Sequence, residues 1–272
     1  MLADLSRWSA RPAGWALIVI AVLALAALGM AYYKGRDSRS YRAVSALVTP
    51  LMAPLARTLQ RDEASALVLP YTSPALQLDA AWRWRNADRV VVDAASRDAL
   101  TMQASAESLW FLNQRGPFAY RMLDGDATVS ARVQVRKRSD PTSTPDIEWQ
   151  FAGLLLRDPA GDAWMARENY VFNVVGYCCG ELQIETKSTR DGISAIDSKR
   201  WDGGDAELSI RREGARFVLS ARIDSNAPWR QVAAYERPDL PRRLQVGVIL
   251  YAHSEGRGRH DLQATFRDFA VR

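Results

Sequence analysis

Histidine and cysteine are both scarce in this sequence, with only two of each among 272 residues. His253 and His260 are too few for a histidine-based metal site, and neither lies next to a nucleophile motif that could complete a catalytic triad. No Asp-x-Asp-x-Asp-Gly loop of the calcium-binding kind occurs either. The sequence therefore predicts neither a metal nor another cofactor.

An excess of basic charge is also missing from most of the chain. Residues 1–63 contain 8 Lys+Arg and 4 Asp+Glu, whereas the remaining residues contain 28 and 27. A nucleic-acid-binding domain would carry a basic face, so we expect no nucleic-acid partner. The basic N-terminal part suits anionic lipid headgroups instead.

The one long run without charge is Gly14–Tyr33. At about 1.5 Å per residue, a helix over this run would be roughly 30 Å long, enough to cross a lipid bilayer. Trp15 lies at one end and Tyr32 and Tyr33 at the other, where interfacial aromatic residues are expected. The sequence predicts a tail over residues 1–13 and then a transmembrane helix, so the lipid bilayer is an expected partner of a single-pass protein.

A cleaved secretory signal is the alternative for this segment. Arg7 and Arg11 would form its charged region and Gly29–Ala31 its cleavage site, but the apolar run exceeds the roughly 7–15 residues of such signals. The orientation is open as well, because basic residues between 34 and 42 would favour a cytoplasmic body, whereas a short N-terminal tail usually stays inside. We favour a retained anchor in a bacterial inner membrane with a periplasmic body.

Residues 34–78 form a juxtamembrane segment with an apolar stripe at helical spacing. The stripe consists of Val44, Leu47, Val48, Leu51, Leu55 and Leu59. Pro50 and Pro54 interrupt it, which indicates a kinked helix or two short helices, followed by an extended linker. Such a stripe could lie among headgroups or bind a partner subunit, and packing against the protein's own β domain is the alternative.

From residue 79 to residue 272 the apolar pattern has a period of two, which is typical of β-strands. The clearest segments are residues 128–136, the inner-strand candidates 151–156 and 244–251, and the hairpin 206–212 with 216–223. We expect an all-β domain, an antiparallel two-sheet jelly-roll sandwich, because short strands alternate with turn signals. Its predicted core includes Val129, Val133, Leu154, Leu208, Phe217, Val246 and Phe266.

The order of these segments resembles that of a known superfamily. WFLNQRGPFAYRMLDGDATVSARVQV is followed by EWQFAGLLLRD, ETKSTRDGIS, ELSIRREGARFVLSARID and LPRRLQVGVILYA. The series is similar to concanavalin A-like lectin/glucanase domains, the laminin-G-like jelly rolls, over nearly all of residues 79–272. The resemblance implies the sandwich fold, and it bears on fold more than on activity.

Two pairs of carboxylates at alternate positions are candidates for catalysis, because glucanases of that superfamily use such spacing on a strand. Retaining hydrolysis needs two carboxylates about 5–5.5 Å apart. Asp146 and Glu148 are the nearest match, but the third carboxylate of the superfamily pattern is missing and the pair follows the loop DPTSTP. Asp124 and Asp126 flank a glycine in a turn signal. We therefore expect turn carboxylates, no catalytic residues and no enzyme.

Tryptophan side chains form sugar-binding platforms in lectin-like sandwiches, which makes the tryptophans of the body candidate ligand residues. The candidates are Trp110, Trp149, Trp164 and Trp201, with Trp229 also available. Large aromatic side chains are equally the ordinary filling of a sandwich core. We expect most of them to be buried and a minority to form an exposed platform for carbohydrate.

The adjacent Cys178 and Cys179 lie in the sequence GYCCG. Neighbouring Cα atoms are about 3.8 Å apart, below the usual disulfide span of about 4.4–6.8 Å. A vicinal disulfide would therefore be strained and easily reduced, although the flanking glycines would tolerate the distorted turn. Free thiols are the favoured interpretation, with a vicinal disulfide or a bridge to another chain as alternatives.

Two classes of function fit these features. The anchor and the stripe favour a non-enzymatic interaction module, an accessory or stabilising subunit of a larger membrane assembly with other membrane subunits as partners. The alternative is a membrane-tethered domain that binds carbohydrate or an envelope polymer, and a glycoside hydrolase is less favoured. We adopt the first class because a simple sugar tether would not need so much membrane-facing surface.

Overall fold

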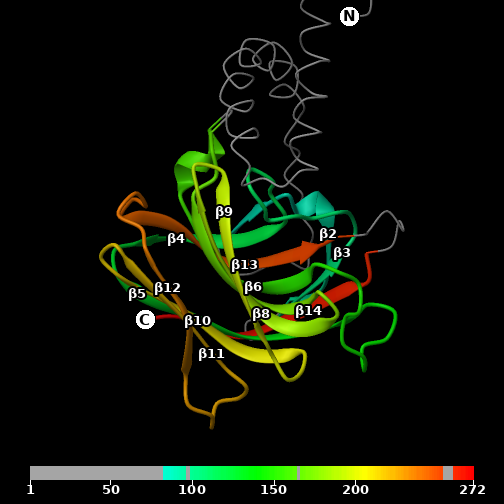
Figure 1. Cartoon of the computed structure of the whole chain (residues 1–272). Helices are drawn as coiled ribbons and strands as arrows, with labels where there is room; N and C mark the ends of the chain where they lie inside the picture. The colour runs from blue at the N-terminus through cyan, green and yellow to red at the C-terminus, as the bar shows by residue number, and fades with distance from the viewer. Residues whose placement is uncertain (1–81, 96–98, 164–165, 254–259) are drawn as a thin grey trace, which may run out of the picture. The chain divides into compact units, whose positions relative to one another are not determined.

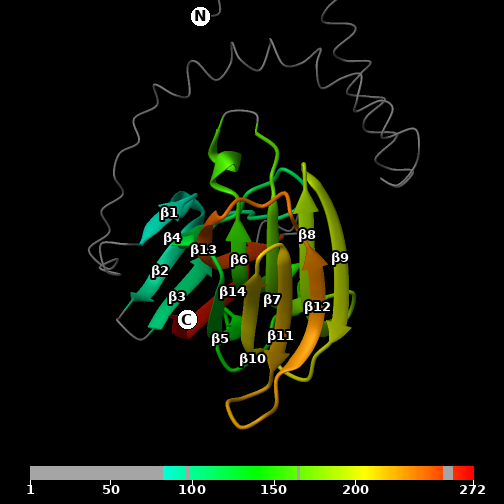
Figure 2. The same cartoon turned by 90° about the vertical axis from the view of Figure 1, so that its left-hand side faces the viewer.

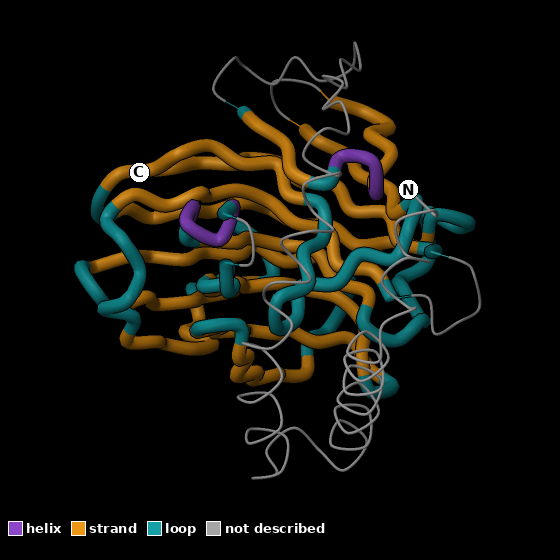
Figure 3. Tube along the Cα trace, turned by 90° about the horizontal axis from the view of Figure 1, so that it is seen from above, coloured by secondary structure: helices purple, strands orange, loops and turns teal. Residues whose placement is uncertain are grey.

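The structure is a computed structural model that describes residues 82–95, 99–163, 166–253 and 260–272. Its strands form two antiparallel sheets of seven strands each. The only helices within these ranges are two short 3-10 turns, η1 (Ala87–Arg89) and η2 (Pro159–Asp162), as Figure 3 shows. The predicted all-β class and two-sheet antiparallel architecture are confirmed for this part of the chain.

The order of strands mixes segments from both halves of the domain (Figures 1 and 2). The first sheet runs β1 (Arg83–Arg85), β4 (Phe118–Asp124), β13 (Arg243–Ala252), β6 (Gln150–Arg157), β7 (Tyr170–Cys178), β8 (Glu181–Arg190) and β9 (Ile193–Arg200). The second sheet runs β12 (Arg230–Glu236), β11 (Arg216–Arg222), β10 (Asp205–Glu213), β5 (Ala127–Lys137), β14 (Leu262–Val271), β3 (Ala99–Ala104) and β2 (Val90–Ala95). Because β13 and β14 lie inside the sheets, the C-terminal part of the chain completes both layers.

The main core lies between the two sheets and follows the period-two pattern of the sequence. In β5, Val129, Ala131, Val133 and Val135 are buried, and the residues that alternate with them are partly or wholly exposed. All seven predicted core residues are buried: Val129, Val133, Leu154, Leu208, Phe217, Val246 and Phe266. The predicted inner strands are also confirmed, because β6 is buried along its whole length and β13 from its second residue onward.

Tight hairpins follow the turn signals of the sequence. β10 and β11 pair around Gly214, whose φ is 60°, as predicted from the alternating segments on either side. Asp191 and Gly192 join β8 to β9 with φ values of 50° and 73°, as expected for the type I′ turns that suit two-residue hairpins. β9 is an edge strand of the first sheet, and seven of its eight residues are exposed.

The predicted membrane-facing elements lie outside the described residues. These are the Gly14–Tyr33 helix with Trp15, Tyr32 and Tyr33, and the stripe between Val44 and Leu59. Within the described ranges, no helix combines the length and the apolar character that crossing a bilayer requires. The anchor, its orientation and the stripe therefore stay predictions.

We predict that Leu154→Ala lowers the free energy of unfolding by about 2–5 kcal/mol, because it leaves a cavity at a fully buried position between the sheets. Urea denaturation of the purified protein measures the change. Ile193→Ala is the control, since that side chain is 65% exposed and its loss should cost less than about 0.5 kcal/mol. Equal effects of the two changes would contradict the assignment of the core.

Candidate ligand-binding site

A second apolar cluster covers the outer face of the first sheet, the face turned away from the second sheet. Side chains alternate along a strand, so Phe151 and Leu155 of β6 point to this face while Leu154 points into the main core. The cluster consists of Trp110, Phe118, Tyr120, Phe151, Leu155, Tyr170, Phe172, Val174, Cys178, Ile249 and Tyr251. We call residues 105–117, between β3 and β4, the covering segment because they lie over this face.

Trp110 is the main apolar side chain that the covering segment contributes. It is fully buried, and its ring packs edge-on against Phe118 and Tyr170 with both centroid distances at 5.8 Å. The interpretation of Trp110 as an exposed ligand platform is therefore wrong. The physical reason is that the covering segment turns the indole onto the aromatic face of the sheet, where it is removed from water.

Polar contacts attach the covering segment to several strands of the first sheet. Ser108 forms an isolated bridge to the end of β13. The backbone N–H of Leu112 donates to Oγ of Ser194 in β9 at 3.0 Å. Between these points, the ammonium group of Lys187 donates to the carbonyl oxygen of Trp110 at 2.8 Å. The segment is thus attached to β13, to β8 and to the edge strand β9 of the first sheet.

Lys187 is a fully buried cation surrounded by aromatic rings. Its Nζ lies 4.5 Å from the ring centre of Phe172 and 4.9 Å from that of Tyr251. A carboxylate oxygen of Glu185 lies 3.2 Å from the same atom. Burial lowers the pKa of Lys187 and raises the pKa of Glu185, while the attraction between the two charges opposes both shifts. Lys187 thus links the covering segment to β8, and the buried pair is closed to ligands.

A buried charge network joins the β6–β7 loop to the covering segment. Arg157 donates to both oxygens of Glu168, from Nε at 2.6 Å and from Nη2 at 2.8 Å, and neither side chain is exposed. Arg115 of the covering segment also pairs with Glu168, and Asp162 pairs with Arg157. Burial alone would raise the pKa of Asp162, but its hydrogen bond to Arg157 and the nearby positive charge hold the pKa below its usual value.

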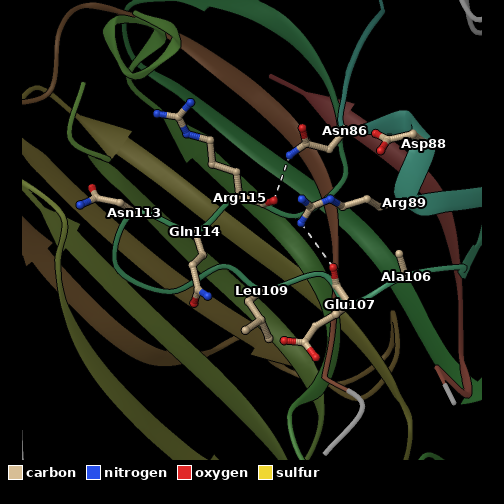
Figure 4. A pocket seen from close by; sticks show the side chains of 9 residues that line it. All are labelled: Asn86, Asp88, Arg89, Ala106, Glu107, Leu109, Asn113, Gln114 and Arg115. Carbon is tan, nitrogen blue, oxygen red and sulfur yellow. Dashed lines mark hydrogen bonds between the residues drawn. The ribbon is translucent and has the colours of Figure 1, made fainter. Parts of the chain in front are cut away.

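An open polar pocket of about 670 Å³ lies between η1 and the covering segment (Figure 4). Its lining residues are Asn86, Asp88, Arg89, Ala106, Glu107, Leu109, Asn113, Gln114 and Arg115. Asn86 has a φ of 50° and donates from Nδ2 to the carbonyl oxygens of Arg115 and Gly116 at 2.9 and 3.0 Å, which fixes one wall. Carboxylate, guanidinium and amide groups face one space, so the pocket can both donate to and accept from hydroxyl groups of a ligand.

Trp149 provides an exposed aromatic surface close to this pocket. The residue is 43% exposed and has a φ of 55°, an uncommon conformation for a bulky side chain. Its ring lies 5.2 Å from the ring of His253, whose Nδ1 lies 3.5 Å from a carboxylate oxygen of Glu107 in the pocket lining. An apolar platform and a polar pocket therefore share one side of the domain.

The other candidate tryptophans do not combine exposure with such a pocket. Trp201 is half-buried against the main core, and its Nε1 donates to the carbonyl oxygen of Asp205 at 2.9 Å, which argues against a platform. Trp229 is 42% exposed, but the guanidinium of Arg222 lies 4.5 Å from its ring centre. Trp164 lies outside the described residues.

The sequence-predicted carboxylate pairs stand in loops and turns, as expected. Asp146 is exposed and pairs with Lys137 at 2.5 Å. Glu148 instead accepts hydrogen bonds from the backbone of the β7–β8 turn. Asp124 and Asp126 lie at the β4–β5 turn. Asp146 and Glu148 thus have different partners.

Cys178 and Cys179 are free thiols in this structure, with their sulfur atoms 2.8 Å apart. Cys178 belongs to the outer-face cluster and is buried, whereas Cys179 is exposed in the turn. No disulfide joins them here, and their redox state in solution stays a prediction.

No family model matches the sequence, and no curated relative does. Similar folds are found among solved structures. A functionally unknown protein from Saccharomyces cerevisiae is 16% identical with a TM-score of 0.56, and the match covers 71% of this chain and 96% of that one. A xylan β-1,4-xylosidase from Bacillus halodurans is 12% identical with a TM-score of 0.50.

The match to the xylosidase covers 70% of this chain, which spans only 37% of that enzyme's length. Lectin I-B4 from Griffonia simplicifolia is 10% identical with a TM-score of 0.47, over 73% of this chain and 97% of the lectin. At such identities the comparisons show the fold alone. They place the described domain among antiparallel jelly-roll and β-sandwich folds, which confirms the predicted resemblance at that level.

We predict that Glu168→Ala lowers the free energy of unfolding by about 3–5 kcal/mol, because it removes the buried carboxylate that Arg157 and Arg115 share and leaves the buried Arg157 with only the partly exposed carboxylate of Asp162. Glu213→Ala removes an ion pair whose partners are both half-exposed, so it should cost less than about 1 kcal/mol. Urea denaturation compares the two variants. A cost of Glu168→Ala no larger than that of the control would show that the buried network is not needed for stability.

A pH dependence follows from the lowered pKa of Asp162. Its ion pair contributes stability that is present above the ordinary aspartate pKa of about 3.9 and is lost as pH falls through the lower folded-state pKa. Asp162→Asn should therefore flatten the fall of unfolding free energy below pH 4, since the variant has no proton to bind there. Denaturation at a series of pH values measures this slope, and identical slopes would contradict the assignment.

Proposed function

We propose that this domain is a non-enzymatic carbohydrate-binding module. The observation that carries the proposal is the exposed Trp149 ring beside the polar pocket. Sugars present apolar C–H faces together with closely spaced hydroxyl groups. An indole face next to carboxylate, amide and guanidinium groups provides both kinds of contact.

The backbone around the site supports the same conclusion. Trp149, Asn86 and Leu112 all have positive φ, at 55°, 50° and 53°, and they lie at the platform, in the pocket wall and in the covering segment. Non-glycine residues in this region are uncommon and tend to gather where a surface is shaped for binding. The buried Glu168 network then keeps Arg115 of the pocket wall in place.

The proposal excludes catalysis by the carboxylates that the sequence singled out. Glu148 accepts two backbone hydrogen bonds, and Asp146 is engaged with Lys137.

The membrane anchor would tether this module to a bacterial inner membrane. The accessory-subunit function predicted from the Val44–Leu59 stripe rests on residues outside the described ranges, and no contact of the described residues adds support to it.

The test uses the purified full-length chain in mild detergent and a panel of polysaccharides, including xylan because a xylosidase shares the fold. We predict saturable binding to at least one glycan. Trp149→Ala should weaken it about tenfold, since an aromatic contact is worth roughly 1 kcal/mol beyond its area. Asp88→Ala combined with Gln114→Ala should weaken it as well, because both side chains line the pocket.

Trp229→Ala is the matched control, because that ring is equally exposed but lies between β11 and β12. Isothermal titration calorimetry with a soluble oligosaccharide compares the variants, and circular dichroism confirms their folding. Absence of binding across the panel, or equal losses for the two tryptophan variants, would refute the proposed site. Release of reducing sugar that Glu148→Gln abolishes would show that the domain is an enzyme.

A further inference from the structure

Three potential metal ligands converge at the turn between β7 and β8. The sulfur atoms of Cys178 and Cys179 and a carboxylate oxygen of Glu148 all lie within 4.8 Å of one another. The Glu148 carboxylate comes from the loop before β6, thirty residues earlier in the chain than Cys178. Two thiols and a carboxylate from separate segments therefore surround one point at the surface.

The local turn chemistry gives an independent reason to assign a function to Cys179. Cys179 and Gly180 have φ values of 60° and 81° and join β7 to β8 as a two-residue hairpin. Asparagine, aspartate or glycine is the usual residue at the first of these positions. The next hairpin follows that rule with Asp191 and Gly192 at φ values of 50° and 73°. Cys179 thus departs from the rule at the position where its thiol meets Cys178.

The carboxylate is already oriented by the same turn. Glu148 accepts a hydrogen bond from the backbone N–H of Cys179 and one from that of Gly180, the latter at 3.1 Å. A carboxylate offers about four lone-pair directions, and these two hydrogen bonds use two of them, so lone pairs remain for a metal ion. In metal sites, a ligating carboxylate usually accepts further hydrogen bonds from the protein, which hold it in position. Cys179 is exposed, which leaves an entry path and an open coordination position.

We propose that Cys178, Cys179 and Glu148 bind a thiophilic divalent cation such as Zn²⁺ or Cd²⁺. Two thiolates and one carboxylate match the ligand preference of these ions, and a water molecule would complete a tetrahedron. Zinc–sulfur bonds of about 2.3 Å place the two sulfur atoms further apart than 2.8 Å, so the thiols separate slightly on binding. This site is distinct from the polar pocket and does not depend on the proposed carbohydrate function.

Binding exchanges protons for the metal ion. Each thiol loses one proton to solvent, so one divalent cation replaces two protons, and the complex of two thiolates and one carboxylate carries a single negative charge. Apparent affinity should consequently rise with pH, and two protons should be released per ion.

The experiment titrates the full-length protein, in detergent and with a phosphine reductant, with Co²⁺ as an optical probe and then with Cd²⁺. We predict one Co²⁺ per chain with a sulfur-to-cobalt charge-transfer band in the near ultraviolet, and displacement of Co²⁺ by Cd²⁺. Cys179→Asn keeps a residue that suits the turn but removes the thiol, so it should weaken binding by more than about tenfold. Glu148→Gln should weaken binding while the band remains.

Asp191→Asn in the neighbouring hairpin is the matched control and should leave the titration unchanged. Cobalt binding without a sulfur band would place the ion elsewhere, for instance at His253, and would overturn the proposal. Full affinity in Cys179→Asn, or no binding at all by the reduced protein, would overturn it as well. Glycan binding measured in parallel on Cys179→Asn separates this site from the proposed carbohydrate site.

Discussion

The Glu168 carboxylate is the buried group on which the arrangement of the outer face depends. It is excluded from water, and it is paired with Arg157 of β6 and Arg115 of the covering segment. A buried carboxylate is tolerated only when its partners stay in place, so strand, loop and covering segment must be ordered together. The backbone N–H of Glu168 also donates to Oδ1 of Asn113 at 3.0 Å. Two residues of the pocket lining, Arg115 and Asn113, are therefore positioned by one buried residue, the first by its carboxylate and the second by its backbone N–H.

The sequence predicted the sandwich well because its inner faces follow a period of two. Leu154, Val133 and Phe217 could be assigned to the core from alternation alone, since a strand between two layers must bury every second side chain. The covering segment has no such period. The sequence around Trp110 does not show that this side chain packs on a second apolar face of the first sheet. That face is assembled from strands that are distant in sequence.

The polar pocket and the cluster of Cys178, Cys179 and Glu148 could not be predicted from the sequence, because each is also assembled from segments that are distant in the chain. Asn86 and Gln114 meet only through the sheet order, and Glu148 reaches Cys179 only through the pairing of β6 with β7. The structure does show a local sign near each site, in the backbone conformation. Trp149 and Cys179 occupy positive-φ positions that favour other residue types. Departures of this kind commonly mark residues retained for something other than folding.

The exposed edge strand β9 has a consequence for how the protein behaves at high concentration. An unpaired strand edge can template the addition of a foreign strand, and Ile193 and Ile196 would favour such an addition at its beginning. Asp197 and Lys199 carry charge along its second half. A copy of the chain that tried to continue the sheet would have to bring these charges together and remove them from water. The charges of β9 thereby oppose edge-to-edge association of the first sheet.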